Sequence, residues 1–299
     1  MPQCPACGRP VAMARPHCVY CGARLPDGAV GVATRSNPAA APAPPSAEPQ
    51  PKRLLLILDL ATGAVADLAN ALGLSAFEAG QRLRRGGLQL HRVLDEHAAK
   101  EEAAVLLASG LSVLLVPEDE ARTPPLPALG GRLEAATLRL RTAEREIAVR
   151  GEELLLVVRG PIAREYQPSL RLRRPGIAKL EGGYRLHLHR LGEPHPVELD
   201  PGNFEFGHAV TGSSLLDLNA WVDAVAHGVP VDDAFRHQPP VLGPAENASS
   251  GVMAATAGLS RLPRKGRFGK EETPALLDNV AQFRFYSGWR AVVERQRTG

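Results

Sequence analysis

The four cysteines of this chain constrain its fold more than any other residues, because they lie in one short cluster. They form two Cys-x-x-Cys pairs, each followed by a glycine: Cys4 with Cys7, and Cys18 with Cys21. Each such turn directs two thiolates toward one point, and two turns together supply the four sulfur ligands of a tetrahedral Zn²⁺ ion. The sequence therefore predicts a small Cys4 zinc site within residues 1–30.

Four sulfur ligands close the coordination sphere, so the predicted zinc is structural rather than catalytic. His17 is an alternative ligand beside Cys18, and four free or disulfide-bonded cysteines are another alternative. Nothing near the N-terminus resembles a signal peptide, so we expect a cytoplasmic chain, in which thiols stay reduced. A thioredoxin-like redox role is the weakest alternative, because those motifs follow a strand of a larger α/β domain.

The segment with these two motifs resembles the short zinc-ribbon module at the N-terminus of many bacterial multidomain proteins. The resemblance covers residues 1–25 and implies that the four cysteines bind zinc in a small knob that contacts protein or nucleic acid. The next segment, residues 31–52, is rich in Pro and Ala and cannot bury a core, so we expect it to be a linker.

Length and composition limit the class of protein. The chain has 299 residues, enough for two domains of ordinary size after the linker. No apolar run approaches the roughly 18–20 residues that a membrane-spanning helix needs, so we expect no transmembrane segment. The net charge of +3 does not require a nucleic-acid partner. Arginine greatly outnumbers lysine, which is typical of a GC-rich bacterial genome.

Residues 53–122 show the clearest pattern of a folded α/β domain. Strands are predicted at three apolar or alternating runs: residues 54–58, 88–94 and 111–116. Two helical segments separate the first two strands, and a capping box of Ser75 and Glu78 opens the second of them. A third helix is predicted at residues 100–109, so the expected order is βααβαβ.

This order resembles the C-terminal domain of bacterial ribosomal protein L7/L12. Three short fragments support the resemblance: Leu72-Gly73-Leu74, Glu78-Ala79 and Lys100-Glu101-Glu102-Ala103. It implies a small α/β fold whose helical face binds translation factors, and therefore docking rather than catalysis. The charges depart from the family pattern, because the corresponding helix carries these residues in place of a lysine-rich face: Gln81, Arg82, Arg84 and Arg85.

Residues 130–229 are predicted to form a β-rich domain. Its short runs, separated by Gly, Pro or charged turns, are typical of antiparallel strands: residues 135–141, 146–150, 154–158, 169–173, 184–190, 197–199 and 204–206. An amphipathic helix follows them. Seven strands and a closing helix are the order of a pleckstrin-homology-like barrel. The glycine pairs Gly130-Gly131 and Gly182-Gly183 are expected in turns.

One predicted strand of this domain places Arg185, His187 and His189 on one face and two leucines on the other. A metal or pH-sensing site is one interpretation, with His195 nearby. The pattern favours a solvated polar face opposite a leucine core. No carboxylate pair has the spacing of a catalytic acid and base, and the chain has no G-x-S-x-G, P-loop or G-x-G-x-x-G motif. No small-molecule substrate is therefore evident.

A patch of arginines lies on and after another predicted strand, at Arg171, Arg173 and Arg174, with Lys179 close behind. Such a patch can meet the phosphates of a lipid or a nucleic acid. Its alternation with leucine favours an exposed strand face instead.

Residues 238–270 are predicted to be a flexible basic segment, because proline and small residues precede a run of positive charges. A docking helix is predicted in residues 271–299, with helical spacing from Leu276 to Phe283. Its many aromatic side chains favour docking on the chain's own domains. The alternative is a partner-binding helix anchored by Trp289.

Together these patterns predict a multidomain α+β protein of the bacterial cytoplasm that recognises another molecule. The favoured function is a non-enzymatic, zinc-containing adaptor or regulatory protein that mediates protein–protein interaction. The alternative is nucleic-acid binding through the zinc ribbon and the arginine patches. An enzyme with an unrecognised site is less favoured.

Overall fold

The computed structural model describes residues 52–167, 178–207, 214–245 and 275–298, which belong to one compact unit. The four predicted zinc ligands, Cys4, Cys7, Cys18 and Cys21, lie outside the described residues, as does nearly all of the predicted linker. Arg171, Arg173 and Arg174 also lie outside them. The fold of the described part is mixed α/β with several sheets, in agreement with the predicted α+β class.

The first part of the fold is a three-stranded antiparallel sheet with four helices. Its elements are β1 (Arg53–Asp59), α1 (Val65–Leu72), α2 (Ala76–Arg85), β2 (Leu88–Asp95), α3 (Glu96–Ala108), β3 (Ser112–Pro117) and α4 (Glu118–Ala121). The predicted order βααβαβ is confirmed, and only the short α4 was not expected. The predicted capping box is also confirmed, because the Ser75 hydroxyl accepts the Glu78 N–H and the Glu78 carboxylate accepts the Ser75 N–H.

Strand β1 is the centre of this sheet and is buried on both faces. Leu56 and Leu58 pack with side chains of α1, α2 and α3, whereas Leu55 and Ile57 belong to a second apolar cluster that includes residues of helix α7 (Val280–Thr298). A strand that is buried on both faces reads as a continuous apolar run, which explains the unbroken leucine and isoleucine sequence of β1.

The remaining strands form two further sheets. The smaller one has the order β11 (Glu205–Phe206), β5 (Gly130–Glu134), β6 (Thr137–Arg141) and β7 (Glu146–Arg150). The larger one has the order β13 (Gly243–Pro244), β14 (Ala275–Asp278), β8 (Leu154–Gln167), β9 (Ala178–Arg190), β10 (Val197–Leu199) and β4 (Leu126–Ala128), and β12 (Val231–Asp232) pairs with β8. Two short 3₁₀ turns connect elements, η1 (Gly151–Glu153) and η2 (Ala234–His237).

Most of the predicted strands of this part coincide with β6 to β11, and helix α5 (Ser214–Val225) follows them as expected. The predicted strand at residues 169–173 lies outside the described residues. The two glycine pairs were expected in turns, and this prediction is wrong, because they lie inside β5 and β9. An added Cβ on Gly131 would lie 2.3 Å from the Arg139 carbonyl oxygen, so the glycine allows close strand contact.

The end of the chain differs from the prediction in two ways. Leu276 and Leu277 were expected in a helix, but they lie in β14, and α7 begins at Val280 after Asn279. The segment beginning at residue 238 was expected to be flexible, but Gly243–Pro244 pairs with β14. The rest of that predicted segment, residues 246–270, lies outside the described residues.

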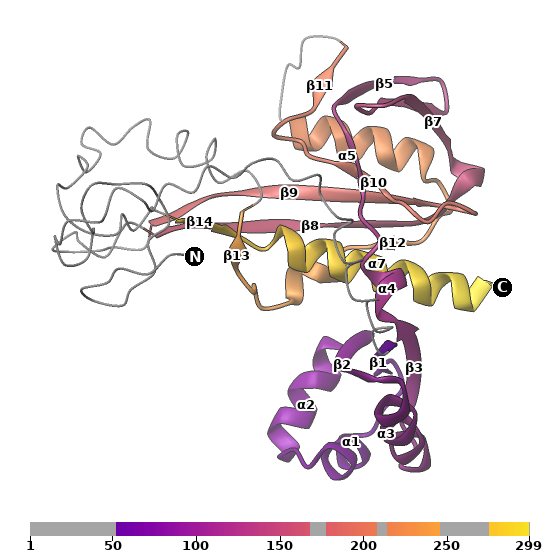
Figure 1. Ribbon diagram of the computed structural model, residues 1–299, viewed down its shortest axis with the longest axis vertical. Helices are drawn as coiled ribbons and strands as arrows, with labels where there is room; N and C mark the ends of the chain where they lie inside the picture. Colours follow the sequence, from indigo (N-terminus) through magenta and orange to yellow (C-terminus); the bar gives the residue numbers. More distant parts are fainter. Residues whose placement is uncertain (1–51, 168–177, 208–213, 246–274, 299) are drawn as a thin grey trace, which may run out of the picture. The chain divides into compact units, whose positions relative to one another are not determined.

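Helix α7 packs along one face of the β8–β9 hairpin, and α5 covers the other face together with the smaller sheet (Figure 1). The docking of α7 on its own chain is confirmed, because Phe283 and Trp289 are 0 % and 2 % exposed. Gly288 permits the closest approach, since an added Cβ would collide with the carbonyl oxygen of Ala121 in α4. Of the helices in the described ranges, none combines the length and the apolar character needed to cross a membrane.

Candidate functional site

Strand β9 contributes two buried faces with different chemistry. Leu186 and Leu188 point into the apolar core formed with α5. On the other face Arg185, His187 and His189 are only 7 %, 1 % and 5 % exposed. The predicted solvated polar face is therefore wrong. Helix α7 covers this face, and its side chains replace water as hydrogen-bond partners.

The buried polar face is organised around Ser287 of α7, which contacts both histidines. Its hydroxyl oxygen lies 2.9 Å from Nδ1 of His187 and 2.7 Å from Nε2 of His189. Glu198 lies directly opposite His187 in the register of β9 and β10, and its carboxylate lies 3.0 Å from Nε2 of His187. Arg284, one turn before Ser287, donates two hydrogen bonds of 2.8 Å to the same carboxylate.

The charge state of Glu198 follows from these neighbours. Burial alone would raise the pKa of this carboxyl group, but the hydrogen bonds from Arg284 and His187 outweigh burial and hold its pKa well below the usual range. Glu198 is therefore ionised at neutral pH. An ionised carboxylate only accepts hydrogen bonds, so Nε2 of His187 must carry the proton that it donates to Glu198.

The remaining protons are then assigned by elimination. Burial lowers the pKa of His187, against the opposing effect of Glu198. Burial also lowers the pKa of His189, and the positive charge of Arg295 contributes to this. Both rings are therefore neutral. Neutral His187 has an unprotonated Nδ1, which accepts the Ser287 hydroxyl hydrogen, and the Ser287 oxygen accepts the Nε2–H of His189. We call this chain of donors, from His189 through Ser287 and His187 to Glu198, the histidine relay.

The histidine relay contains a serine, a histidine and a glutamate in contact, as a hydrolase site does, but its surroundings do not suit catalysis. Ser287 is 0 % exposed and His187 is packed edge-on against Phe283 at a ring distance of 4.8 Å, so a substrate has no path to the hydroxyl. The part of the chain that the structure describes also contains no group of three or more His, Cys, Asp or Glu side chains arranged to hold a metal ion. His195 does not join the relay, because it is bonded to the Pro124 carbonyl. The relay therefore fixes the position of α7.

A second buried carboxylate, Asp232 of β12, ties α7 to the larger sheet. It accepts hydrogen bonds from the Ala234 N–H at 2.8 Å and from the Tyr286 hydroxyl at 3.0 Å, and it also pairs with Arg290. Burial raises the pKa of the Tyr286 hydroxyl above its ordinary value, and the Asp232 charge raises it further, so Tyr286 remains a neutral donor.

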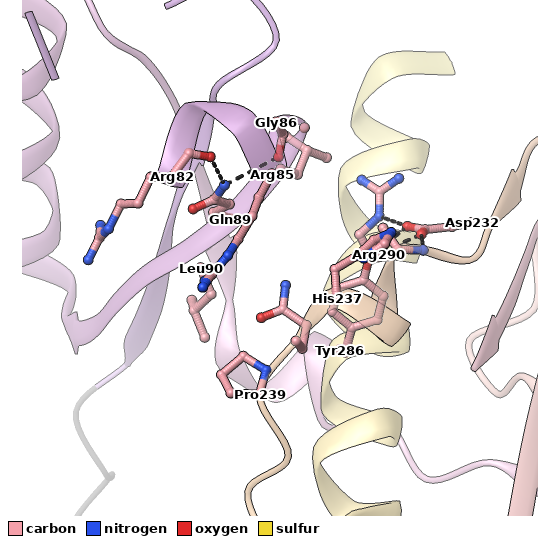
Figure 2. A pocket seen from close by; sticks show the side chains of 14 residues that line it. Arg82, Arg85, Gly86, Gln89, Leu90, Asp232, His237, Pro239, Tyr286 and Arg290 are labelled. Carbon is pink, nitrogen blue, oxygen red and sulfur yellow. Dashed lines mark hydrogen bonds and ion pairs between the residues drawn. The ribbon is translucent and has the colours of Figure 1, made fainter. Parts of the chain in front are cut away.

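A pocket of about 290 Å³ opens beside this carboxylate (Figure 2). Figure 2 shows the end of α2 and the start of β2 on one side, and η2 with α7 on the other. The polar side chains that line it are Arg82, Arg85, Gln89, Asp232, His237, Gln238, Tyr286 and Arg290. Its lining is mostly polar, which suits a polar ligand rather than an apolar one.

The outward face of α2 is a second candidate surface. Phe77 is 68 % exposed, and the helical spacing places Gln81, Arg84 and Arg85 on the same side. Ala79 is buried on the opposite side against the sheet. We call Phe77, Gln81, Arg84 and Arg85 the α2 face. Neither arginine of this face has an ion pair with any described residue.

Trp289 was predicted as a possible anchor for a partner, but the structure gives it a different role. It packs against Tyr286 in the chain's own core at a ring distance of 5.0 Å, so a partner cannot contact it without displacing α7. This part of the prediction is corrected to a core position. The sequence analysis did not identify Ser287, Glu198 or Asp232. A signal was present, because the small pair Ser287–Gly288 between two aromatic residues marks a helix face in close contact.

Comparison with known proteins identified no relative of this chain. No model of a known protein family matches the chain, and neither a curated protein nor a solved structure is similar to it.

Proposed function

We propose that this chain is an adaptor protein that binds an acidic surface of another protein through the α2 face and does not catalyse a reaction. The α2 face carries the proposal: an aromatic side chain that is 68 % exposed lies beside two arginines without ion pairs among the described residues. Aromatic and arginine side chains are the commonest anchors of protein interfaces. An acidic partner would supply the carboxylates that the described residues do not provide there.

The N-terminal segment supplies a second contact in this proposal. Cys4, Cys7, Cys18 and Cys21 would hold a structural zinc ion in a ribbon, and residues 31–52 would link it to the rest of the chain. The donor set supports this, because four thiolates suit a closed tetrahedral zinc site. We place the protein in the bacterial cytoplasm, where such thiols stay reduced and available to zinc.

Two fold resemblances belong to the same proposal. Residues 53–122 would share the fold of the L7/L12 C-terminal domain, which the order βααβαβ supports. The part from β5 to α5 would be a relative of the pleckstrin-homology-like barrel, which its two antiparallel meanders and closing helix support. Both folds commonly serve recognition, so each agrees with an adaptor role.

Nucleic-acid binding is the second candidate, because the arginines of α2 that favour an acidic protein also favour phosphates. The two candidates differ in their dependence on salt and on the aromatic residue. Backbone phosphate binding weakens steeply with salt and tolerates loss of one aromatic side chain, whereas a protein interface anchored by Phe77 does not tolerate that loss.

The test is a cross-linked affinity capture from native lysate, with and without nuclease, analysed by quantitative mass spectrometry. We expect the wild-type chain to capture a specific protein that Phe77→Ser and Arg84→Glu each lose. The matched control is Val105→Ser, which changes a residue that is 62 % exposed on α3 and away from the α2 face. It should retain the partner.

Two further results would decide between the candidates. Capture that disappears with nuclease would replace the adaptor proposal with nucleic-acid binding. Capture that survives in both α2 variants but is lost when the four cysteines are changed to serine would move the contact from α2 to the ribbon. Equal capture by every variant would overturn both contacts.

A further inference from the structure

The pocket of Figure 2 has an unusual charge balance. Its lining contains three arginines and one carboxylate, Asp232. Asp232 is 7 % exposed and already engaged by the Ala234 N–H, Tyr286 and Arg290. Its charge is therefore neutralised within the wall of the pocket. Arg82 and Arg85 remain, and neither has an ion pair with a described residue, so no carboxylate of the lining pairs with these two guanidinium groups.

Two of the acceptors that would repel an anion are occupied. Helix α2 ends at this pocket, and the exposed carbonyl groups at a helix end are negatively polarised. Here the side-chain amide of Gln89 donates to the carbonyl oxygens of Arg82 and Gly86, at 2.8 and 3.3 Å. These two hydrogen bonds cap part of the end of α2 and satisfy both carbonyl groups within the chain.

The opposite wall adds further donors. Arg236 donates to Nε2 of His237, so Nδ1 is the ring nitrogen that can donate to a ligand. Gln238 also lines the pocket and its side-chain amide has no hydrogen bond within the described residues. Tyr286 cannot add a negative charge, because burial and Asp232 raise the pKa of its hydroxyl.

Size and charge together define the ligand. A volume of about 290 Å³ is just below the range for small-molecule sites, which begins at about 300 Å³, so the ligand must be small. Two guanidinium groups match a dianion with several oxygen acceptors better than they match a single carboxylate. We propose that this pocket binds the phosphate group of a small phosphate monoester through Arg82 and Arg85.

Binding at this place would have a structural consequence. One wall belongs to the three-stranded sheet and its helix α2, and the other belongs to η2 and α7, so a bound phosphate would connect the two. Phe77 and Arg84 do not line the pocket. Arg85 belongs both to the α2 face and to the pocket, whereas Arg82 belongs to the pocket alone. Variants of Phe77, Arg84 and Arg82 therefore test the two proposals separately.

The experiment is a titration of the full chain with inorganic phosphate and with O-phosphoserine. The two quantities measured are the melting temperature, Tm, and the NMR chemical shifts of the Gly86 and Gly87 amides. Sodium chloride at equal ionic strength and sodium acetate are the comparators. We expect both phosphate compounds to raise Tm and to shift these amides in a saturable way, because a ligand that binds only the folded state stabilises it. Acetate and chloride should not.

The variants locate the site. Arg82→Ala with Arg85→Ala should raise Kd by about tenfold or more, since each removes a charge-assisted contact. Arg84→Ala is the matched control on the same helix and should leave Kd unchanged, as should Phe77→Ser. Arg85→Lys is a second variant for the case in which the double variant does not fold. It keeps the charge but not the planar guanidinium group, so it should bind phosphate with intermediate affinity.

Three outcomes would overturn the proposal. They are the absence of any saturable shift with phosphate, an equal response in the wild type and the Arg82/Arg85 variants, or an acetate response as strong as that of phosphate. The last would indicate a carboxylate site. If Phe77→Ser loses partner capture but keeps the phosphate response, then protein binding and phosphate binding are separable properties of the chain.

Discussion

The two faces of β9 are both shielded from water, one by α5 and the other by α7. Leu186 and Leu188 make apolar contacts that have no directional requirement, so an apolar side chain of similar volume can replace either of them. His187 and His189 make hydrogen bonds that require one tautomer and one position of Ser287. The comparison teaches that the apolar face supplies burial, whereas the polar face specifies where α7 sits along the sheet.

The largest effect should come from the charge at the end of the histidine relay. Glu198→Ala removes the carboxylate that Arg284 and His187 both contact, and it breaks an ion pair whose carboxylate is 5 % exposed. Breaking a buried ion pair by removing one partner costs about 3–5 kcal/mol. We expect a loss of unfolding free energy of that size, measured by urea denaturation at pH 7.5.

A matched carboxylate at the surface serves as the control. Glu134 also contacts two arginines, Arg132 and Arg139, but all three side chains are largely exposed. Glu134→Ala should change stability little, because water replaces the lost partner. If the two variants were equally stable, the polar face of β9 would have no special role in holding α7.

An intermediate effect is expected at the centre of the relay. Ser287→Ala leaves Nδ1 of His187 without a donor and Nε2–H of His189 without an acceptor. An unsatisfied buried polar group costs about 1–3 kcal/mol, so we expect a decrease in unfolding free energy in this range.

The apolar face provides the comparison for this variant. Leu188→Met conserves volume and introduces no unsatisfied group, so it should cost less than about 1.5 kcal/mol. A larger loss for Leu188→Met than for Ser287→Ala would reverse the assignment of roles to the two faces. The amide exchange rates of α7 should distinguish them as well, because only Ser287→Ala is expected to accelerate exchange there.

A graded effect, small near neutral pH, should come from mild acidification alone. The pKa values of His187 and His189 are lowered in the folded state by burial, while an unfolded histidine titrates near about 6.5. Below that pH the unfolded chain binds more protons than the folded chain, so stability falls as the pH decreases. The low pKa of Glu198 adds a loss only below about pH 4.3, where an unfolded glutamate begins to protonate.

The measurement is the urea midpoint between pH 7.5 and pH 5. We expect a steady decrease in the wild type and the same decrease in His97→Ala, which changes a histidine side chain that is 84 % exposed. Burial also lowers the pKa of His91, so His91→Gln should remove a smaller part of the slope. A midpoint that does not move over this range would contradict neutral, buried histidines in β9.

The contrast between β1 and β9 shows what the sequence could predict. In β1 the unbroken apolar run predicts a strand buried on both sides without reference to the rest of the chain. In β9 the alternation predicts correctly which residues share a face, but it cannot show that the polar face is buried. That depends on Ser287, which lies 100 residues beyond His187 in the chain.

The same limit applies to the pocket. Arg82 and Arg85 are ordinary exposed helix residues in the sequence, and Asp232 and Arg290 lie far from them along the chain. Only the packing of α7 against β12 and the position of the end of α2 bring them to one opening. The arginines at residues 171–174, by contrast, stood out in the sequence, and they lie outside the described residues.

The burial of β1 on both faces has a consequence for the synthesis of the protein. Leu55, Ile57 and Val116 are in place once β3 has left the ribosome, but helix α7, which shares their cluster, is translated last of all described elements. Until then the nascent chain exposes the apolar face of the three-stranded sheet that α7 later covers. Chaperones bind such exposed apolar surfaces, and aggregation can begin from them. This domain is therefore completed only when α7 has been translated.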